Sequence, residues 1–545
     1  MFLTYNESKE NDKKENDKKD KSILVSSLYM SFAVFLSRIL GLVRELVMAM
    51  VFGASHVTDI FLVAYRIPNL LRDLLAEGAF SAAFVPVFAE VCSKEKERMA
   101  SRELLWELFF LLTLITGAIG ILIIIFAPEL TNLFAPSFAK NPERFNLSVD
   151  LIRLMAPYLF CVSIAALFMG VLNTLKFFFV PSLSPAAFNV VLIAFTILLP
   201  SYLISSGINA AYALGSGVLI GGIFQSLIQL PLLIKNGFAP LWPKKFFTAN
   251  ARRVLIRLGP GMIGFAATQI NILVTTILAS AIVGAVSWLN YAFRLFQFPL
   301  GIFGVAIANS HLVHFSIAYR NGDLKQARSY LSYSYYLTNA VMIPSMFLIF
   351  FLSSEITHII FERGRFTAYD TMMTSYALKL FALGLPFYGI NKILVPTFYA
   401  IDRQRIPVMI TVFSVLVNVS FCFLLVPKYG FTILALGTTL TVVLSSVGSV
   451  IFLFNILQLK LDFFFDFKLL KFLLASAVVG FLTHKLAIKF FHFNSTIIGE
   501  VISLSLILLT AMICYALFMV ILGEGEFILN FVSKIRNKIS NKLVR

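Results

Sequence analysis

Long apolar runs alternate with short polar or Gly- and Pro-containing breaks from about residue 24 to residue 522. A helix needs about 20 apolar residues to cross the hydrocarbon core of a bilayer, and these runs have that length. The pattern therefore predicts an all-α polytopic membrane protein. Its fourteen predicted spans lie near 24–50, 58–80, 104–126, 150–173, 184–204, 211–235, 255–282, 287–315, 329–352, 373–399, 407–426, 431–457, 469–490 and 496–522.

The composition agrees with this class. Of 545 residues, 59% are hydrophobic and 13% are charged, whereas a soluble protein of this size exposes far more charge. The four cysteines lie far apart and form no Cys-x-x-Cys pair, so we expect neither a disulfide framework nor a zinc site. The polar segment before the first span has the composition of a disordered tail and not of a cleavable signal peptide.

The basic residues gather in alternate loops. The chain carries 45 Lys and Arg against 28 Asp and Glu, a formal net charge of +17. Loops on the side of the termini hold pairs such as Arg403 and Arg405, whereas opposite loops such as 53–57 hold neither Lys nor Arg. By the positive-inside rule both termini are cytoplasmic, and this topology explains the charge without a nucleic-acid partner.

Motifs of catalysis and metal binding are missing from the sequence. There is no Gly-x-x-x-x-Gly-Lys-[Ser/Thr] loop for nucleotide phosphates and no nucleophile elbow. His311 and His314 have a spacing that metal ligands can use, but no nearby carboxylate completes a site. We expect no enzymatic activity, no cofactor and no metal.

A short internal repeat suggests two lobes. Residues 64–67 (AYRI) in the second span resemble residues 292–295 (AFRL) in the eighth. An offset of six spans preserves orientation, so these would be parallel repeats related by a pseudo-two-fold axis along the membrane normal. The predicted organisation is a disordered cytoplasmic tail, two six-helix lobes, two extra C-terminal spans and a basic cytoplasmic tail, with bounds 1–22, 23–236, 237–458, 459–523 and 524–545.

Several arginines lie inside predicted spans. They are Arg38, Arg44, Arg66, Arg72 and Arg294. A charged side chain near a bilayer centre costs roughly 2.5 kcal/mol or more, so it normally faces a cavity and has a function there. The sequence assigns no acid to Arg44 or Arg72, and it contains no acid between Asn250 and Asp323 to pair with Arg294.

Helical geometry does not bring all of these arginines to one face. At about 100° per residue, Arg38 and Glu45 share a face, and Asp59 and Arg66 share another. Arg44 and Arg72 lie off the faces of the arginines that precede them. Gly41 and Pro68 can bend their helices, and a bend inside the membrane is tolerated where backbone lines a cavity.

A structural role is the alternative for some of these charges. Asp73 and Glu77 lie near the cytoplasmic end of the second span, where they can reach the interface or be neutralised. Arg66 can pair with Asp59. For the other arginines we favour an anion ligand, because a guanidinium stays charged and grips phosphate oxygens with two parallel hydrogen bonds.

Four motifs resemble one known family. They are SRILGLVRE (37–45), the run from FGASHVTDIF to PVFAE (52–90), VSWLNYAFRLFQFPLGIFGVAI (286–307) and ERGRFTAYD (362–370). These stretches resemble the MurJ (MviN) family of lipid II flippases in the multidrug/oligosaccharidyl-lipid/polysaccharide exporter superfamily. The resemblance covers essentially the whole chain.

The resemblance implies a site and a substrate. The matching positions of the family's essential arginines are Arg38, Arg44, Arg72 and Arg294, with Asp59 as a required acid, and Glu45 keeps the charge of a common Asp. In the family these residues line a central cationic cavity for the diphosphate and sugar headgroup. Spans 13 and 14 would form the groove for the polyprenyl tail.

Two positions depart from the family pattern. Gln297 stands where many relatives have an acid beside the arginine of span eight. HLVHFS (311–316) replaces the more usual LPxLS. These departures put in question the local pairing of Arg294 and the end of span eight.

We therefore expect an alternating-access flippase in the bacterial inner membrane. It would move undecaprenyl-diphosphate-linked disaccharide-pentapeptide, lipid II, from the inner to the outer leaflet, with membrane lipids and cell-wall synthesis proteins as further partners. The alternatives are a flippase for another polyprenyl-diphosphate glycan, a cation-coupled drug exporter, which would favour acids in the cavity, and a non-transporting scaffold for cell-wall enzymes.

Overall fold

The computed structural model describes residues 30, 32–75, 79–93, 98–459, 467–490 and 496–524, and these residues form helices and no strand. The predicted tail 1–22, Glu77 and residues 525–545 lie outside the described residues. The all-helical membrane fold predicted from the apolar pattern is confirmed.

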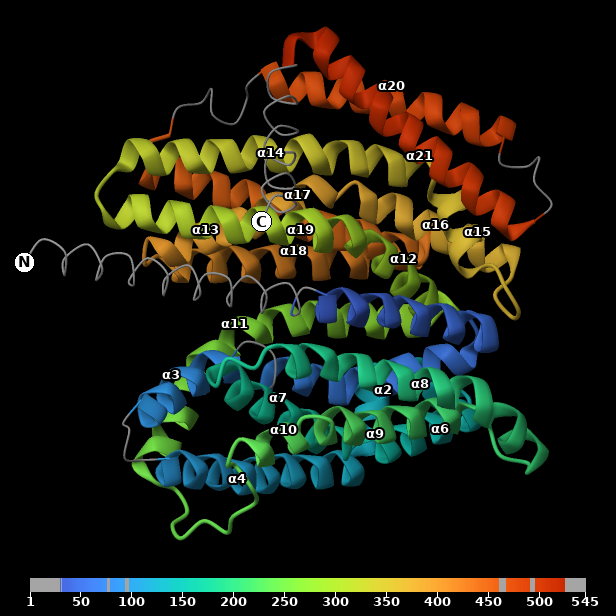
Figure 1. Cartoon of the computed structure of the whole chain (residues 1–545). Helices are drawn as coiled ribbons and strands as arrows, with labels where there is room; N and C mark the ends of the chain where they lie inside the picture. Colours follow the sequence, from blue (N-terminus) through green and yellow to red (C-terminus); the bar gives the residue numbers. More distant parts are fainter. Residues whose placement is uncertain are drawn as a thin grey trace, which may run out of the picture. The chain divides into compact units, whose positions relative to one another are not determined.

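The chain divides into two compact units, residues 1–269 and 270–545, and the division falls inside α11 (Ala249–Ser280). The first unit begins with a helix over residues 32–52. It continues with α2 (His56–Leu75), α3 (Ala79–Ser93), α4 (Arg98–Ile125), α5 (Ala127–Phe134), η1 (Pro136–Lys140), α6 (Pro142–Met155), α7 (Tyr158–Thr174), α8 (Phe179–Ser205), α9 (Ala211–Leu227) and α10 (Leu230–Lys235) (Figure 1).

Local sequence explains where these helices turn and how closely they pack. Gly53 takes φ +66° between the first helix and α2, a conformation that a side chain disfavours. In α9, a Cβ at Gly222 would lie 2.5 Å from the ring of Tyr158, and one at Gly217 would lie 2.6 Å from Leu192 of α8. Small residues therefore let α9 approach its neighbours closely, as is common in membrane helices.

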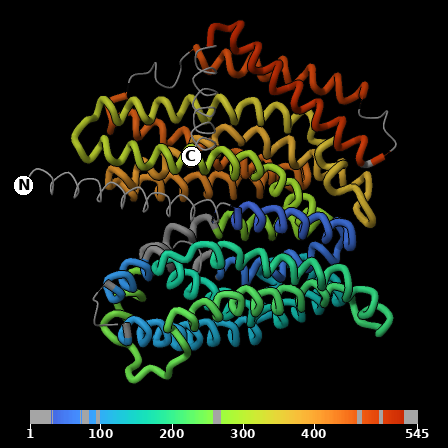
Figure 2. The backbone as a smooth tube through the Cα atoms, in the orientation of Figure 1, coloured from blue at the N-terminus to red at the C-terminus, as the bar shows by residue number. Residues whose placement is uncertain are grey.

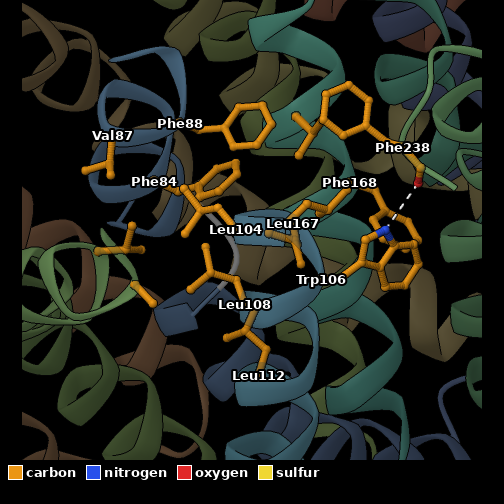
Figure 3. Packing of buried hydrophobic residues seen from close by; sticks show 14 of the residues in the cluster. Phe84, Val87, Phe88, Leu104, Trp106, Leu108, Leu112, Leu167, Phe168 and Phe238 are labelled. Carbon is orange, nitrogen blue, oxygen red and sulfur yellow. Dashed lines mark hydrogen bonds between the residues drawn. The ribbon is translucent and has the colours of Figure 1, made fainter. Parts of the chain in front are cut away.

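A large aromatic and aliphatic core holds α3, α4 and α7 together in the first unit. Figure 3 shows Phe84 and Phe88 of α3 facing Leu104 and Leu108 of α4, with Phe168 of α7 beside them. Trp106 lies at the edge of this core and donates a hydrogen bond to the carbonyl of Phe238, 3.3 Å away. The core therefore extends to the loop that follows α10.

The second unit contains the end of α11 and a further set of helices. They are α12 (Ala285–Pro299), η2 (Leu300–Gly304), α13 (Val305–Arg320), α14 (Leu324–Phe351), α15 (Ser353–Phe361), α16 (Ala368–Ala382), α17 (Leu385–Ala400), α18 (Arg405–Tyr429), α19 (Thr432–Ile456), α20 (Phe467–Phe490), α21 (Ile497–Met519) and η5 (Val520–Glu524). Figure 2 shows α20 and α21 in red beside each other, and α20 packs along α14.

Ten of the described helices are long and apolar enough to cross a membrane, or eleven if the pair α16 and α17, bent by 46°, forms one span. The other three predicted spans fall on residues 32–52, α2 and α11. The first two carry several charged residues, and in α11 the described apolar segment is Gln269–Ser280. The count of fourteen therefore stays a prediction.

Candidate functional site

Arg44 and Glu45 lie at the centre of a polar cluster in the first unit. The guanidinium of Arg44 donates from Nη2 to Glu45 Oε1 and from Nη1 to Asn189 Oδ1 at 3.1 Å. The side chain of Glu45 is 3% exposed and that of Arg44 is 15% exposed. Arg44 compensates the charge of this deeply buried carboxylate, which matters because an uncompensated buried charge is strongly destabilising.

Asn189 joins α8 to the first helix. Its amide oxygen accepts from Arg44, and its Nδ2 donates to the carbonyl of Ser37 at 3.3 Å. The helix runs without interruption through Gly41, where a Cβ would lie 3.7 Å from Asn189 Nδ2. A methyl group at position 41 would therefore make only an ordinary van der Waals contact with the asparagine.

Two tyrosines place Arg72 in the same surroundings. Tyr65 of α2 lies 5.9 Å, centroid to centroid, from Tyr158 of α7, which is fully buried. The Tyr158 hydroxyl interacts with Tyr65 and with the half-buried Arg72, and both tyrosines lie close to Arg44. We call these six residues the Arg44 cluster: Arg44, Glu45, Tyr65, Arg72, Tyr158 and Asn189.

The other predicted residues of the first unit lie on the same two helices as Arg44 and Arg72. Asp59 is 3% exposed and lies in the first turn of α2, where a negative charge is stabilised by the helix dipole. Arg66 is half-buried and Arg38 is exposed. α2 remains helical through Pro68. The side chain of Asp73 lies outside the described part.

Arg294 belongs to the second unit. It lies on α12 as an exposed residue between the buried Ala292 and Leu295, and Gln297 is exposed on the same helix. The next turn, Leu300–Gly304, is a π-helix that follows Pro299. Short π-helical segments inside α-helices are frequent at functional sites. The span predicted at 287–315 is thus one long helical stretch, Ala285–Arg320, with a local irregularity close to Arg294.

Sequence reasoning missed three members of the Arg44 cluster and one pairing. Tyr65, Tyr158 and Asn189 were not predicted, although a single asparagine within the apolar α8 is a usable signal. The sequence assigned no acid to Arg44, whereas the structure pairs it with Glu45. Adjacent helical residues do not face each other, but both side chains are long enough to meet.

The cluster has a composition suited to an anion. It contains two guanidinium groups, one carboxylate, two phenols and one amide, so positive charge and hydrogen-bond donors predominate. A guanidinium matches phosphate geometry and stays charged. The arrangement can hold an anionic headgroup among membrane helices.

The profile of the family described as "Lipid II flippase MurJ" matches residues 48–510. The chain belongs to the MurJ family.

Individual relatives agree with this membership. A "Probable lipid II flippase MurJ" from Buchnera aphidicola subsp. Acyrthosiphon pisum is 34% identical over 401 residues, covering 73% of this chain and 77% of the relative. The "Lipid II flippase MurJ" of Burkholderia cenocepacia is 35% identical over 424 residues, covering 76% of this chain and 80% of the relative.

Solved structures resemble this chain over most of its length. "Lipid II flippase MurJ, inward closed conformation" superimposes with a TM-score of 0.74 at 28% identity and covers 91% of this chain and 99% of that structure. An inward-facing multidrug resistance MATE family transporter gives a TM-score of 0.63 at 14% identity over 77% of this chain and 94% of that structure. The second likeness shows a shared fold alone.

Proposed function

We propose that this protein moves lipid II, a polyprenyl-diphosphate-linked glycopeptide, from the inner to the outer leaflet of the bacterial inner membrane by alternating access. The observation that carries the proposal is the Arg44 cluster, which assembles two arginines among helices of a MurJ-family fold. A diphosphate brings about two negative charges and cannot cross hydrocarbon unaided. A cationic site among the helices would supply the compensating positive charge.

In this proposal the substrate binds through its diphosphate. Arg72 and Arg44 grip phosphate oxygens, and the Tyr65 and Tyr158 hydroxyls orient the guanidinium groups. Arg38 and Arg294 supply further positive charge, with Asp59 as the balancing acid. Glu45 and Asn189 position Arg44. α20 and α21 take the polyprenyl tail.

The membrane potential is the proposed source of energy. Moving one elementary charge through the membrane is worth about 2.3 kcal/mol per 100 mV. With the cytoplasm negative, outward movement of a headgroup with about two negative charges is favourable by roughly 4–5 kcal/mol per 100 mV. The emptied, net-positive site is then drawn inward by the same field. Transport in vesicles clamped at zero potential tests this drive, and an unchanged rate would rule it out.

Complementation of a flippase-depleted bacterium tests the whole proposal. Arg72→Ala and Arg294→Ala should abolish growth while the protein still inserts and accumulates, and lipid II should build up on the cytoplasmic side. Arg→Lys at either position should also impair growth, because an ammonium loses the bidentate geometry. Normal growth with both alanine variants would refute the arginine assignment.

The same assay separates the alternatives. Accumulation of a different polyprenyl-diphosphate glycan would assign another substrate. A drug exporter would leave the precursor pool unchanged, and a scaffold would tolerate loss of the charges. The proposed topology places both termini in the cytoplasm, which reporter fusions at residues 1 and 545 can test.

A further inference from the structure

The loop at residues 236–248, between α10 and α11, is an unusual segment of the first unit. It is irregular, yet side chains of one helix, α4, hold it in place. Arg102 donates from Nε to the carbonyl of Ala239 at 2.7 Å and from Nη2 to that of Pro240 at 3.1 Å. Glu107 accepts from the backbone N–H of Thr248 and from its hydroxyl.

Two further features stiffen the loop. Trp106 donates to the carbonyl of Phe238, whose side chain is buried in the core between α3, α4 and α7 (Figure 3). Pro240 and Pro243 fix the backbone φ angle at two more positions. Anchoring of this kind exceeds what a connection between two helices needs.

The fixed loop presents aromatic rings and ammonium groups outward. Trp242 is 71% exposed, and Phe246 and Phe247 are also exposed. The Trp242 ring packs on Phe110 of α4 with centroids 4.6 Å apart. Lys244 and Lys245 are exposed between the aromatic residues.

The position of Phe110 on α4 places these rings near the edge of the hydrocarbon. Glu107 is the last charged residue of α4, and residues 108–125 carry no charge. Phe110 lies one turn beyond Glu107, so Trp242 packs at the level where charge gives way to apolar sequence. Tryptophan prefers this interfacial depth, where one part of the ring is apolar and another meets water.

Charge identifies the occupant. The sequence contains no acid from residue 151 to residue 322, and the Glu107 carboxylate that contacts the loop accepts hydrogen bonds from Thr248. Each Lys near an anionic membrane surface contributes about 1 kcal/mol. A protein partner would require an acidic surface, whereas anionic phospholipids are already present at this depth.

We propose that residues 236–248 form a surface anchor that binds anionic phospholipid headgroups through Lys244 and Lys245, with Trp242 embedded in the interface. The anchor fixes the depth of α4 and of the start of α11 in the bilayer. The leaflet is the inner one if the proposed topology holds, but the binding itself does not depend on the topology or on the transported substrate.

Fluorescence of the full-length protein in nanodiscs tests the anchor. Subtracting the emission of a Trp242→Phe variant from that of the wild type isolates Trp242 from Trp106 and Trp288. As phosphatidylcholine is replaced stepwise by phosphatidylglycerol, we expect this difference signal to shift to shorter wavelength. The shift should weaken at high salt, because screening shortens the range of the lysine charges. Both faces of a nanodisc are accessible, so the result is independent of topology.

The double variant K244Q/K245Q should lose most of this shift over the same range of phosphatidylglycerol, because each lysine contributes about 1 kcal/mol at an anionic surface. The matched control R403Q/R405Q removes two exposed charges, one from the turn after α17 and one from the first residue of α18, and should leave the signal unchanged. An equal response of K244Q/K245Q and wild type, or a wild-type signal that ignores lipid charge, would overturn the proposal. A signal that changes only on adding the soluble fraction of the cell would assign the loop to a protein partner and also overturn it.

Discussion

Each of the two units buries a polar network among its helices, and the networks differ in charge. In the first unit, Arg44 and Glu45 bring permanent charges together with Asn189. In the second, His311 of α13 faces Ser334 of α14 at 3.2 Å and Thr397 of α17 at 2.9 Å. Hydroxyls can donate or accept, so a neutral imidazole is satisfied there.

The difference in charge suggests different roles for the two networks. Neutral hydrogen bonds are sufficient to hold three helices together, as His311 shows. Buried ion pairs give little net stability, because desolvation offsets the attraction between the charges. The Arg44 cluster therefore requires another explanation, and the proposed anionic substrate would supply it.

The largest expected effect comes from breaking the charge balance of the cluster. Arg44→Ala removes the guanidinium that compensates the buried Glu45 carboxylate, which should destabilise the protein by about 3–5 kcal/mol and abolish transport. The double variant Arg44→Ala, Glu45→Gln removes both charges and should regain much of the stability while transport stays absent. Thermal unfolding and complementation measure the two properties. Recovery of growth in the double variant would show that Arg44 has a structural role alone.

Removing the neutral network should lower stability but leave transport intact. His311→Phe leaves the buried hydroxyl of Ser334 without this contact and should cost about 1–3 kcal/mol. Transport per folded molecule should stay near the wild-type value. Unfolding temperature and transport normalised to folded protein test this pair of outcomes. A fully stable variant that cannot transport would assign His311 to the mechanism and remove the contrast between the units.

Asn189 lies between the two cases, since it is neutral but orients Arg44. Asn189→Leu should cost about 1.5–3 kcal/mol of stability, because the amide oxygen accepts from a charged guanidinium. Transport should fall about tenfold, because a misplaced guanidinium loses the geometry that phosphate binding requires. Asn189→Asp adds a second carboxylate and should lower transport further. Unchanged transport in both variants would separate Asn189 from the site.

The smallest effect concerns pH. His358 of α15 contacts Glu362 at 2.8 Å and Glu500 of α21 at 3.5 Å, with Glu355 on its own helix. Burial lowers the pKa of His358, but Glu362 and then Glu500 outweigh this and raise the pKa above its usual value. A raised pKa gives stability that is present below about pH 6.5 and is lost as pH rises through the raised value.

The contact should therefore hold α21 to α15 more firmly in acid than in base. Below about pH 6 we expect the wild type to be more stable than His358→Gln by well under 1 kcal/mol, since the pair is partly exposed. The difference should vanish at alkaline pH, and hydrogen exchange at the start of α21 reports it locally. A difference that grows with pH would contradict the assigned sign.

The fold was predictable because apolar length is a local property of the sequence. The span predicted at 184–204 is α8 at Phe179–Ser205, and that at 431–457 is α19 at Thr432–Ile456. The site was predictable only in part. Arg44 and Arg72 stand out as charges among apolar residues, but their contacts with Tyr158 and Asn189 join residues more than 80 positions apart. Such pairing depends on how helices pack, which a one-dimensional pattern does not contain.

Equilibrium binding of purified full-length protein to lipid II tests the central claim most directly. Charge-assisted hydrogen bonds are worth about 1.5–3 kcal/mol, so Arg72→Gln should bind lipid II at least about tenfold more weakly than the wild type. Arg403→Gln, which removes a charge outside the cluster, should bind as the wild type does. Equal affinity in all three proteins would contradict the assignment of the Arg44 cluster to the diphosphate.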